Sequence, residues 1–124
     1  MLKKWWIYFI RDFKFQNWDS KDKFAIILSS NDTFIDILFT LTTSLVDKYK
    51  NILKNEDFYI IEAGKYCFKK DTMIVITRIE KFTLERFQKL SCEYKDILDD
   101  DDLNIVRNKV YNHPKVPKFY KKYI

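Results

Sequence analysis

The apolar residues of this chain occur in short runs bounded by polar or charged residues, and this pattern constrains the fold more than any other feature. Runs of this length that are rich in isoleucine, threonine and aromatic side chains are typical of buried strands. They occupy residues 6–9, 24–28, 35–43, 58–61 and 72–79. Because 124 residues are the length of one domain, the sequence predicts a single, mainly β domain.

Residues 34–46 fit two different patterns. One face of a helix would gather five apolar side chains, Phe34, Ile37, Leu38, Leu41 and Leu45. Alternate residues from 35 to 43 would instead form one face of a strand. Four threonines lie between positions 33 and 43, and β-branched side chains favour a pleated surface. We therefore predict a strand here, adjacent to the strand at 72–79.

The segments between these runs are predicted from their polar and turn-forming residues. We expect a loop at 16–23, a turn at 29–32, a polar loop or short helical turn at 49–57, and a turn at 64–65. Residues 84–98 are mixed, and we expect a turn of helix followed by an edge strand around 90–94.

The C-terminal region carries a helix signal. Asp99 is a suitable N-cap, and the acidic residues 100–102 complement the helix dipole. Four residues would line one face of this helix, which ends near 112–114: Leu103, Val106, Val110 and Tyr111. Many short strands and one terminal helix suggest a small twisted barrel over residues 1–113, followed by a basic aromatic tail at 114–124.

Composition limits the chemistry. The net charge is +5, and residues 110–124 contain four lysines and no acid, which favours a polyanionic partner. A single glycine excludes glycine-rich phosphate loops. Cys67, Cys92 and His113 lack metal-ligand spacing, so no metal or cofactor is expected. No segment has the length of a membrane span or the form of a signal peptide, so we expect a cytoplasmic protein with reduced thiols and no membrane partner.

The remaining possibility is a reaction at a phosphate group that cationic and hydroxyl side chains catalyse. Lys23 stands at the start of the second predicted strand, and Thr42, Thr43 and Ser44 end the third. Neighbouring strands would bring the ammonium and the hydroxyls to one rim, where a cation stabilises charge that builds up on a phosphate. Arg11 and Arg78 are further candidates for phosphate contact because arginine is a bidentate donor. A lysine at a strand edge is otherwise an ordinary solvated residue.

Several segments resemble, in chain order, the MazF/PemK family of toxin endoribonucleases. Residues 23–29 (KFAIILS) look like its "R-P-x-L-V-L-S" strand, and residues 6–9 (WIYF) are similar to its opening strand. Residues 41–44 (LTTS) resemble its "P-I-T-S" strand end. The closest match is residues 63–74 (AGKYCFKKDTMI), which resemble "A-x-x-x-G-F-x-x-D-S-V-I" and are followed by a similar segment at 78–87.

The resemblance implies an SH3-like β-barrel of the MazF/PemK/CcdB type with a C-terminal α-helix. It also implies the toxin component of a type II toxin–antitoxin system, a homodimer inhibited by a cognate antitoxin peptide. The activity would be metal-independent, sequence-selective cleavage of single-stranded RNA by 2′-hydroxyl attack. Lys23, which stands where the family has arginine, Thr42 and Thr43 would be catalytic, and Arg11, Ser44 and Arg78 would contact RNA.

Two further expectations accompany this interpretation. The alternative function is a non-catalytic barrel of the same type that binds RNA or a partner protein. Trp5, Trp6 and Trp18, together with an aromatic content of 18%, exceed what one small core requires. Exposed aromatic residues tend to mark interfaces, so this content also favours a two-fold homodimer.

Overall fold

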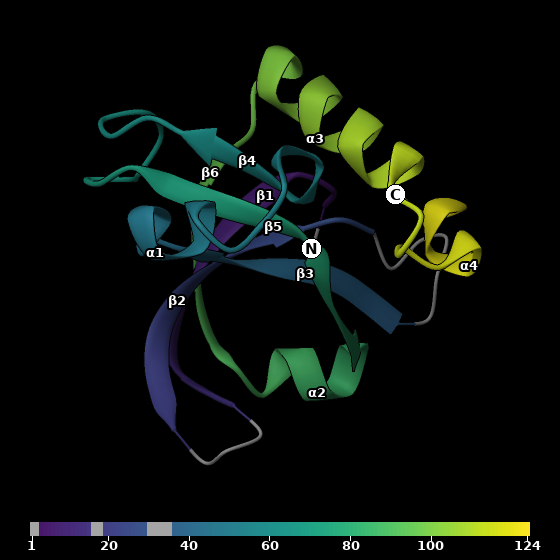
Figure 1. Ribbon diagram of the computed structural model, residues 1–124. Helices are drawn as coiled ribbons and strands as arrows, with labels where there is room; N and C mark the ends of the chain where they lie inside the picture. Colours follow the sequence, from purple (N-terminus) through teal and green to yellow (C-terminus); the bar gives the residue numbers. More distant parts are fainter. Residues whose placement is uncertain (1–2, 16–18, 30–35) are drawn as a thin grey trace.

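The computed structural model describes residues 3–15, 19–29 and 36–124 and is mainly β (Figure 1). In this part of the chain six antiparallel strands form one sheet in the order β4-β5-β3-β2-β1-β6. The strands are β1 (Trp6–Lys14), β2 (Ser20–Ile27), β3 (Asp36–Thr43), β4 (Phe58–Ile61), β5 (Thr72–Thr83) and β6 (Ser91–Ile97). The helices are α1 (Val46–Lys50), the 3-10 turn η1 (Asn55–Asp57), α2 (Leu84–Gln88), α3 (Asp100–Asn112) and α4 (Lys118–Lys121). The predicted β-rich fold with a C-terminal helix is confirmed.

The ambiguous segment is a strand, as predicted. From Asp36 onward it forms β3, which lies between β2 and β5; residues 34 and 35 are outside the described residues. Ile37, Leu38 and Phe39 are consecutive and fully buried, because both faces of the sheet are covered. This burial of successive residues is why a helical stripe and a strand were both compatible with the sequence.

The two faces of the sheet carry separate hydrophobic clusters. Ile7, Ile26 and Leu38 pack with Val106 and Val110 of α3 on one face. The other face is rich in aromatic rings, including Phe13, Phe39, Phe82 and Phe87, the last from α2. Trp5 is 7% exposed and belongs to the first cluster, so it does not supply the exposed surface expected of it. Trp6 is half-buried, and Trp18 lies outside the described residues.

The predicted loop at 16–23 is wrong from residue 20 onward, where β2 begins; residues 16–18 are outside the described residues. A bulge in β1 lets the hairpin extend. The register shifts between Ile10 and Phe13, and Asp12 has a left-handed φ of 51°. Beyond the bulge, the backbones of β1 and β2 stay paired as far as Lys14 and Ser20. Polar residues are therefore part of a strand here although they are not buried. Lys23 therefore lies inside β2, opposite Ile10, and not at the start of the strand.

Other boundaries also differ from the prediction. β5 continues to Thr83 and β6 to Ile97, because pairing with neighbouring strands extends both beyond their apolar runs. The segment predicted as a polar loop from residue 49 is already helical in α1, and its short helical turn is η1. The turn at 64–65 is confirmed, and the φ of 90° at Gly64 explains the glycine.

Helix α3 begins as predicted, with the Asp99 side chain accepting a hydrogen bond from the Asp102 backbone N–H at 2.9 Å. Tyr111 is not on the buried face: it is 38% exposed, and its hydroxyl donates to the carbonyl of Ile124 at 2.8 Å. Val116 and Ile124 are buried in the same cluster as Val110, so residues after 113 also pack against the core. None of the helices in the described ranges is long and apolar enough to cross a membrane.

Candidate functional site

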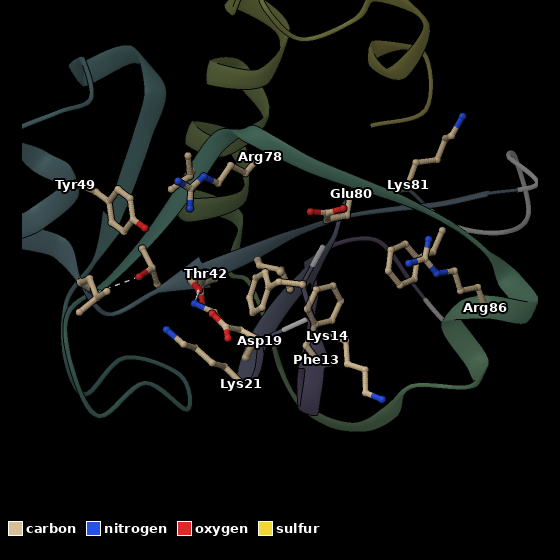
Figure 2. A pocket seen from close by; sticks show the side chains of 17 residues that line it. Phe13, Lys14, Asp19, Lys21, Thr42, Tyr49, Arg78, Glu80, Lys81 and Arg86 are labelled. Atoms are coloured by element: carbon tan, nitrogen blue, oxygen red, sulfur yellow. Dashed lines mark hydrogen bonds between the residues drawn. The ribbon is translucent and has the colours of Figure 1, made fainter. Parts of the chain in front are cut away.

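A cavity of about 810 Å³ opens between the extended β1–β2 hairpin, β3 and β5, with α1 and α2 at its sides (Figure 2). Its lining includes six cationic side chains, Lys14, Lys21, Lys23, Arg78, Lys81 and Arg86. The acidic residues in the lining are two, Asp19 and Glu80. The excess of positive charge suits an anionic ligand with more than one charged group. This cavity is called the main groove below.

Four of the six predicted site residues line the main groove, and they come from three different strands. Lys23 lies on β2, Thr42 and Thr43 end β3, and Arg78 lies on β5. Antiparallel pairing of β2 with β3 and of β3 with β5 brings them together.

The other two predicted residues lie elsewhere. Arg11 is on β1, where its guanidinium Nη2 is 3.9 Å from a carboxylate oxygen of Glu93, and it does not line the groove. Ser44 lines a second, smaller cavity next to the main groove. Sequence position could not separate these residues from the others, because the pairing of Arg11 with Ser91 of β6 and the end of β3 at Thr43 depend on contacts between distant segments.

Lys23 is half-buried, and its ammonium donates a hydrogen bond to the carbonyl of Thr42 at 3.2 Å. Burial lowers the pKa of Lys23 below its ordinary value, and the positive charge of Lys21 lowers it further. The lysine therefore gives up its proton more readily than a lysine in water.

The two threonine hydroxyls make different bonds. The Thr42 hydroxyl donates to the carbonyl of Phe24 at 3.4 Å. The Thr43 oxygen instead accepts the backbone N–H of Leu45 at 3.2 Å. A hydroxyl that accepts still carries a proton to donate. Of the two residues, Thr43 thus has a proton for an oxygen of a bound ligand.

Tyr49 is a groove residue that the sequence analysis missed. It lies on α1, and the guanidinium carbon of Arg78 is 4.8 Å from the centre of its ring. A hydrogen bond from Arg78 lowers the pKa of Tyr49 below its ordinary value, against the opposing effect of burial. Figure 2 shows Tyr49 and Arg78 facing each other at one side of the groove. Nothing in the local sequence signals this pair, since the two residues lie on elements far apart in the chain.

Flat surfaces at the groove come from one ring and one guanidinium. Phe15 in the lining is half-buried, whereas Phe13 and Phe82 are buried core residues. The guanidinium carbon of the exposed Arg86 lies 3.7 Å from the centre of the Phe82 ring. An accessible ring and an exposed guanidinium plane are surfaces on which unpaired bases stack.

Compared with protein-family models and with curated proteins, the chain matches none.

His113 pairs with a side chain that the sequence did not indicate, and His113 does not line the main groove. Its Nε2 lies 2.6 Å from a carboxylate oxygen of Asp57, and its Nδ1 accepts the backbone N–H of Lys115. The ring is 3% exposed, so the pair joins α3 to η1 inside the protein. Within the described ranges, no three histidine, cysteine, aspartate or glutamate side chains converge as metal ligands.

Substitution of Arg78 by leucine is expected to raise the pKa of Tyr49 toward the ordinary tyrosine value of about 10. The reason is that the variant removes the hydrogen bond that stabilises the phenolate. Titration of ring-labelled tyrosine by NMR measures the shift. Lys48→Ala is the control, because its ammonium lies 5.5 Å from the centre of the same ring and has a smaller effect. An unchanged Tyr49 titration in Arg78→Leu contradicts the pairing.

Proposed function

We propose that the protein is an endoribonuclease that binds single-stranded RNA in the main groove and cleaves it without a metal ion. The observation that carries the proposal is the convergence of Lys23, Thr42, Thr43 and Arg78 from three strands on one cationic groove. The groove offers cations for successive phosphates, and the half-buried Phe15 ring and the exposed Arg86 guanidinium offer flat surfaces for unpaired bases.

The proposed reaction needs no group from outside the chain. The 2′ oxygen of one nucleotide attacks the adjacent phosphorus, the bond from phosphorus to the 5′ oxygen breaks, and a 2′,3′-cyclic phosphate and a 5′-hydroxyl result. The ammonium of Lys23 and the Thr43 hydroxyl stabilise the negative charge that builds up on the non-bridging oxygens.

Two groups are suited to the proton transfers. The pKa values of Tyr49 and Lys23 are both lowered, and each group affects the pKa of the other. The phenolate of Tyr49 would accept the proton of the 2′-hydroxyl, and the ammonium of Lys23 would supply a proton to the departing 5′ oxygen. Transfers of this kind are efficient when the pKa values of the acid and the base move toward the working pH.

The test is incubation of the purified protein with a mixed-sequence, 5′-labelled RNA in the presence of EDTA. We expect fragments that end in a cyclic phosphate and in a 5′-hydroxyl, and resistance of the same sequence with 2′-O-methyl groups. Fragments that carry 5′-phosphates, or cleavage that EDTA abolishes, would contradict the mechanism.

One observation favours a second candidate, a protein that binds RNA without cleaving it. Both threonine oxygens are already engaged by backbone groups, and the Lys23 ammonium donates to a backbone carbonyl. Such bonds are also what purely structural residues make. Binding of intact RNA with no cleavage product in the assay above would favour this candidate.

The resemblance to MazF/PemK toxins adds a biological setting to the proposal: a cytoplasmic toxin of a type II toxin–antitoxin system, held inactive by an antitoxin peptide. The positive groove supports a partner with acidic side chains. Arrest of growth on expression, relieved by Lys23→Ala, tests this setting.

A homodimer is the assembly we expect in solution. Tyr94 on the edge strand β6 is 48% exposed, and its ring centre lies 4.8 Å from that of Trp6. An exposed tyrosine that contacts a half-buried tryptophan next to a strand edge is suited to an interface. Light scattering at micromolar concentration is expected to give the mass of two chains, and Tyr94→Lys to reduce it to one. The mass of a single chain for the unchanged protein contradicts the expectation.

A further inference from the structure

A second cavity of about 390 Å³ adjoins the main groove, and the two share Lys23 and Thr42 in their linings. The remaining lining includes Lys69 and Lys70, which follow the turn after β4, as well as Phe24 and Cys67. Because the shared residues lie between the cavities, a polymer that passes over the Lys23 ammonium leaves one cavity and enters the other.

The charge of the second cavity continues that of the main groove. Lys69 and Lys70 are exposed, and across the described segments neither ammonium lies within ion-pair distance of a carboxylate. The acid in this lining is Asp22, one of whose oxygens accepts the backbone N–H of Asp12 at 3.0 Å. Two unpaired cations next to Lys23 extend the path along which phosphates are attracted.

The second cavity also has an aromatic surface. Phe24 is half-buried, and its ring centre lies 5.1 Å from those of both Phe9 and Phe68. Contacts with two neighbouring rings hold the Phe24 ring in place. A ring held in this way, with part of its surface exposed beside cations, is suited to stacking against a base.

We propose that the second cavity is a further nucleotide subsite for single-stranded RNA. The backbone that binds at Lys23 continues past Lys69 and Lys70, and one base lies against Phe24. The inference rests on the proposed RNA substrate, but it does not depend on cleavage. It makes the RNA site longer than the main groove alone.

The first test measures the binding of a 2′-O-methyl oligonucleotide of about 12 nucleotides by fluorescence anisotropy, since this probe lacks the 2′ nucleophile. The double variant Lys69→Ala/Lys70→Ala is expected to bind on the order of tenfold more weakly. The slope of log affinity against log salt should fall by about 1.4, which corresponds to two phosphate contacts on a single strand.

The matched control is Lys118→Ala/Lys122→Ala, which removes the same charge from exposed residues at α4 that line neither cavity. Circular dichroism confirms that both double variants are folded. Equal affinity and equal salt slope in the two variants would overturn the subsite.

The second test uses the two cysteines. Cys67 lines the second cavity and Cys92 lines neither, although both thiols are free and half-buried. Burial raises the pKa of both thiols, so alkylation is measured at alkaline pH by mass spectrometry. Saturating oligonucleotide is expected to slow the alkylation of Cys67 at least fivefold and to leave Cys92 unchanged. Equal rates at Cys67 with and without the oligonucleotide would overturn the proposal.

Cleavage of the matching unmodified RNA is measured in parallel. Protection of Cys67 without cleavage supports the subsite and contradicts the endoribonuclease. Cleavage without protection, and without a difference between the two double variants, supports the endoribonuclease and overturns the subsite.

Discussion

Lys23→Ala is expected to reduce the single-turnover rate of RNA cleavage by a factor on the order of 10² to 10³. The variant removes a half-buried ammonium that lines the main groove and donates to the carbonyl of Thr42. Stabilisation of a phosphate transition state by one such positioned charge contributes about 2–4 kcal/mol. The measurement is cleavage of labelled RNA by excess protein, with the fold checked by thermal unfolding.

Three variants separate a catalytic role of Lys23 from a general loss of charge. Lys50→Ala removes an exposed cation from α1 that lines neither cavity, and it should cleave at the unchanged rate. Lys23→Arg keeps the charge on the phosphate but should recover only part of the activity, because a guanidinium does not give up its proton to the departing 5′ oxygen. Thr43→Ala should lose activity as well. Wild-type rates in both Lys23→Ala and Thr43→Ala would show that the site is elsewhere.

Asp102→Ala is expected to lower the free energy of unfolding by about 3–5 kcal/mol. Asp102 is 5% exposed, and its carboxylate accepts hydrogen bonds from the hydroxyls of Tyr59 and Tyr66. These two bonds to a charged acceptor account for most of the loss. Lys65 also lies 2.7 Å from this carboxylate, but its side chain is 43% exposed and adds little. Urea unfolding followed by circular dichroism measures the change.

Asp101→Ala is the control for Asp102→Ala, because it removes an exposed carboxylate from the same first turn of α3. It should cost less than about 1 kcal/mol, the size of a helix-dipole interaction. Equal destabilisation by the two variants would mean that the helix dipole, and not the buried network, is what matters.

Stability is also expected to fall at acid pH. Burial by itself raises the pKa of Asp102, but hydrogen bonds from Lys65, Tyr59 and Tyr66 outweigh it and hold the pKa below its ordinary value. The hydrogen bond from His113 lowers the pKa of Asp57 likewise. Carboxylates with lowered pKa stabilise the folded state above the unfolded value of about 4, and this contribution is lost as the pH falls through the lower folded value. Urea midpoints between pH 7 and pH 3 should show the fall, with a smaller slope in Asp102→Asn. A pH-independent midpoint would contradict the expectation.

Asp102 differs from its two acidic neighbours in a way that the local sequence does not show. The acidic pattern at residues 100–102 predicts a favourable interaction with the helix dipole, which describes the exposed Asp100 and Asp101. The side chain of Asp102 is instead buried, because its partners Tyr59 and Tyr66 belong to β4 and to the turn that follows it. The burial of that carboxylate depends on contacts between distant segments.

The aromatic content has a similar explanation. An aromatic content of 18% is more than one small hydrophobic core requires, and it therefore favours an exposed aromatic interface. The sheet instead buries both of its faces, and the second face absorbs Phe13, Phe39, Phe82 and Phe87. Composition cannot distinguish a second buried face from a surface patch, since both need the same side chains.

The sequence by itself determined the existence of the strands, the choice of strand for residues 36–43, and the N-cap of α3. These features depend on local periodicity and on side chains within a few residues of each other, which a sequence displays directly. It also identified Lys23, Thr42, Thr43 and Arg78 as candidates. It predicted that Lys23, Thr42 and Thr43 share one rim, but only the tertiary structure decided that Arg78 and Tyr49 line the same groove and that Arg11 does not. The physical reason is that a bulge in β1 and the pairing of β2, β3 and β5 set these distances, and such pairing is a long-range property of the chain.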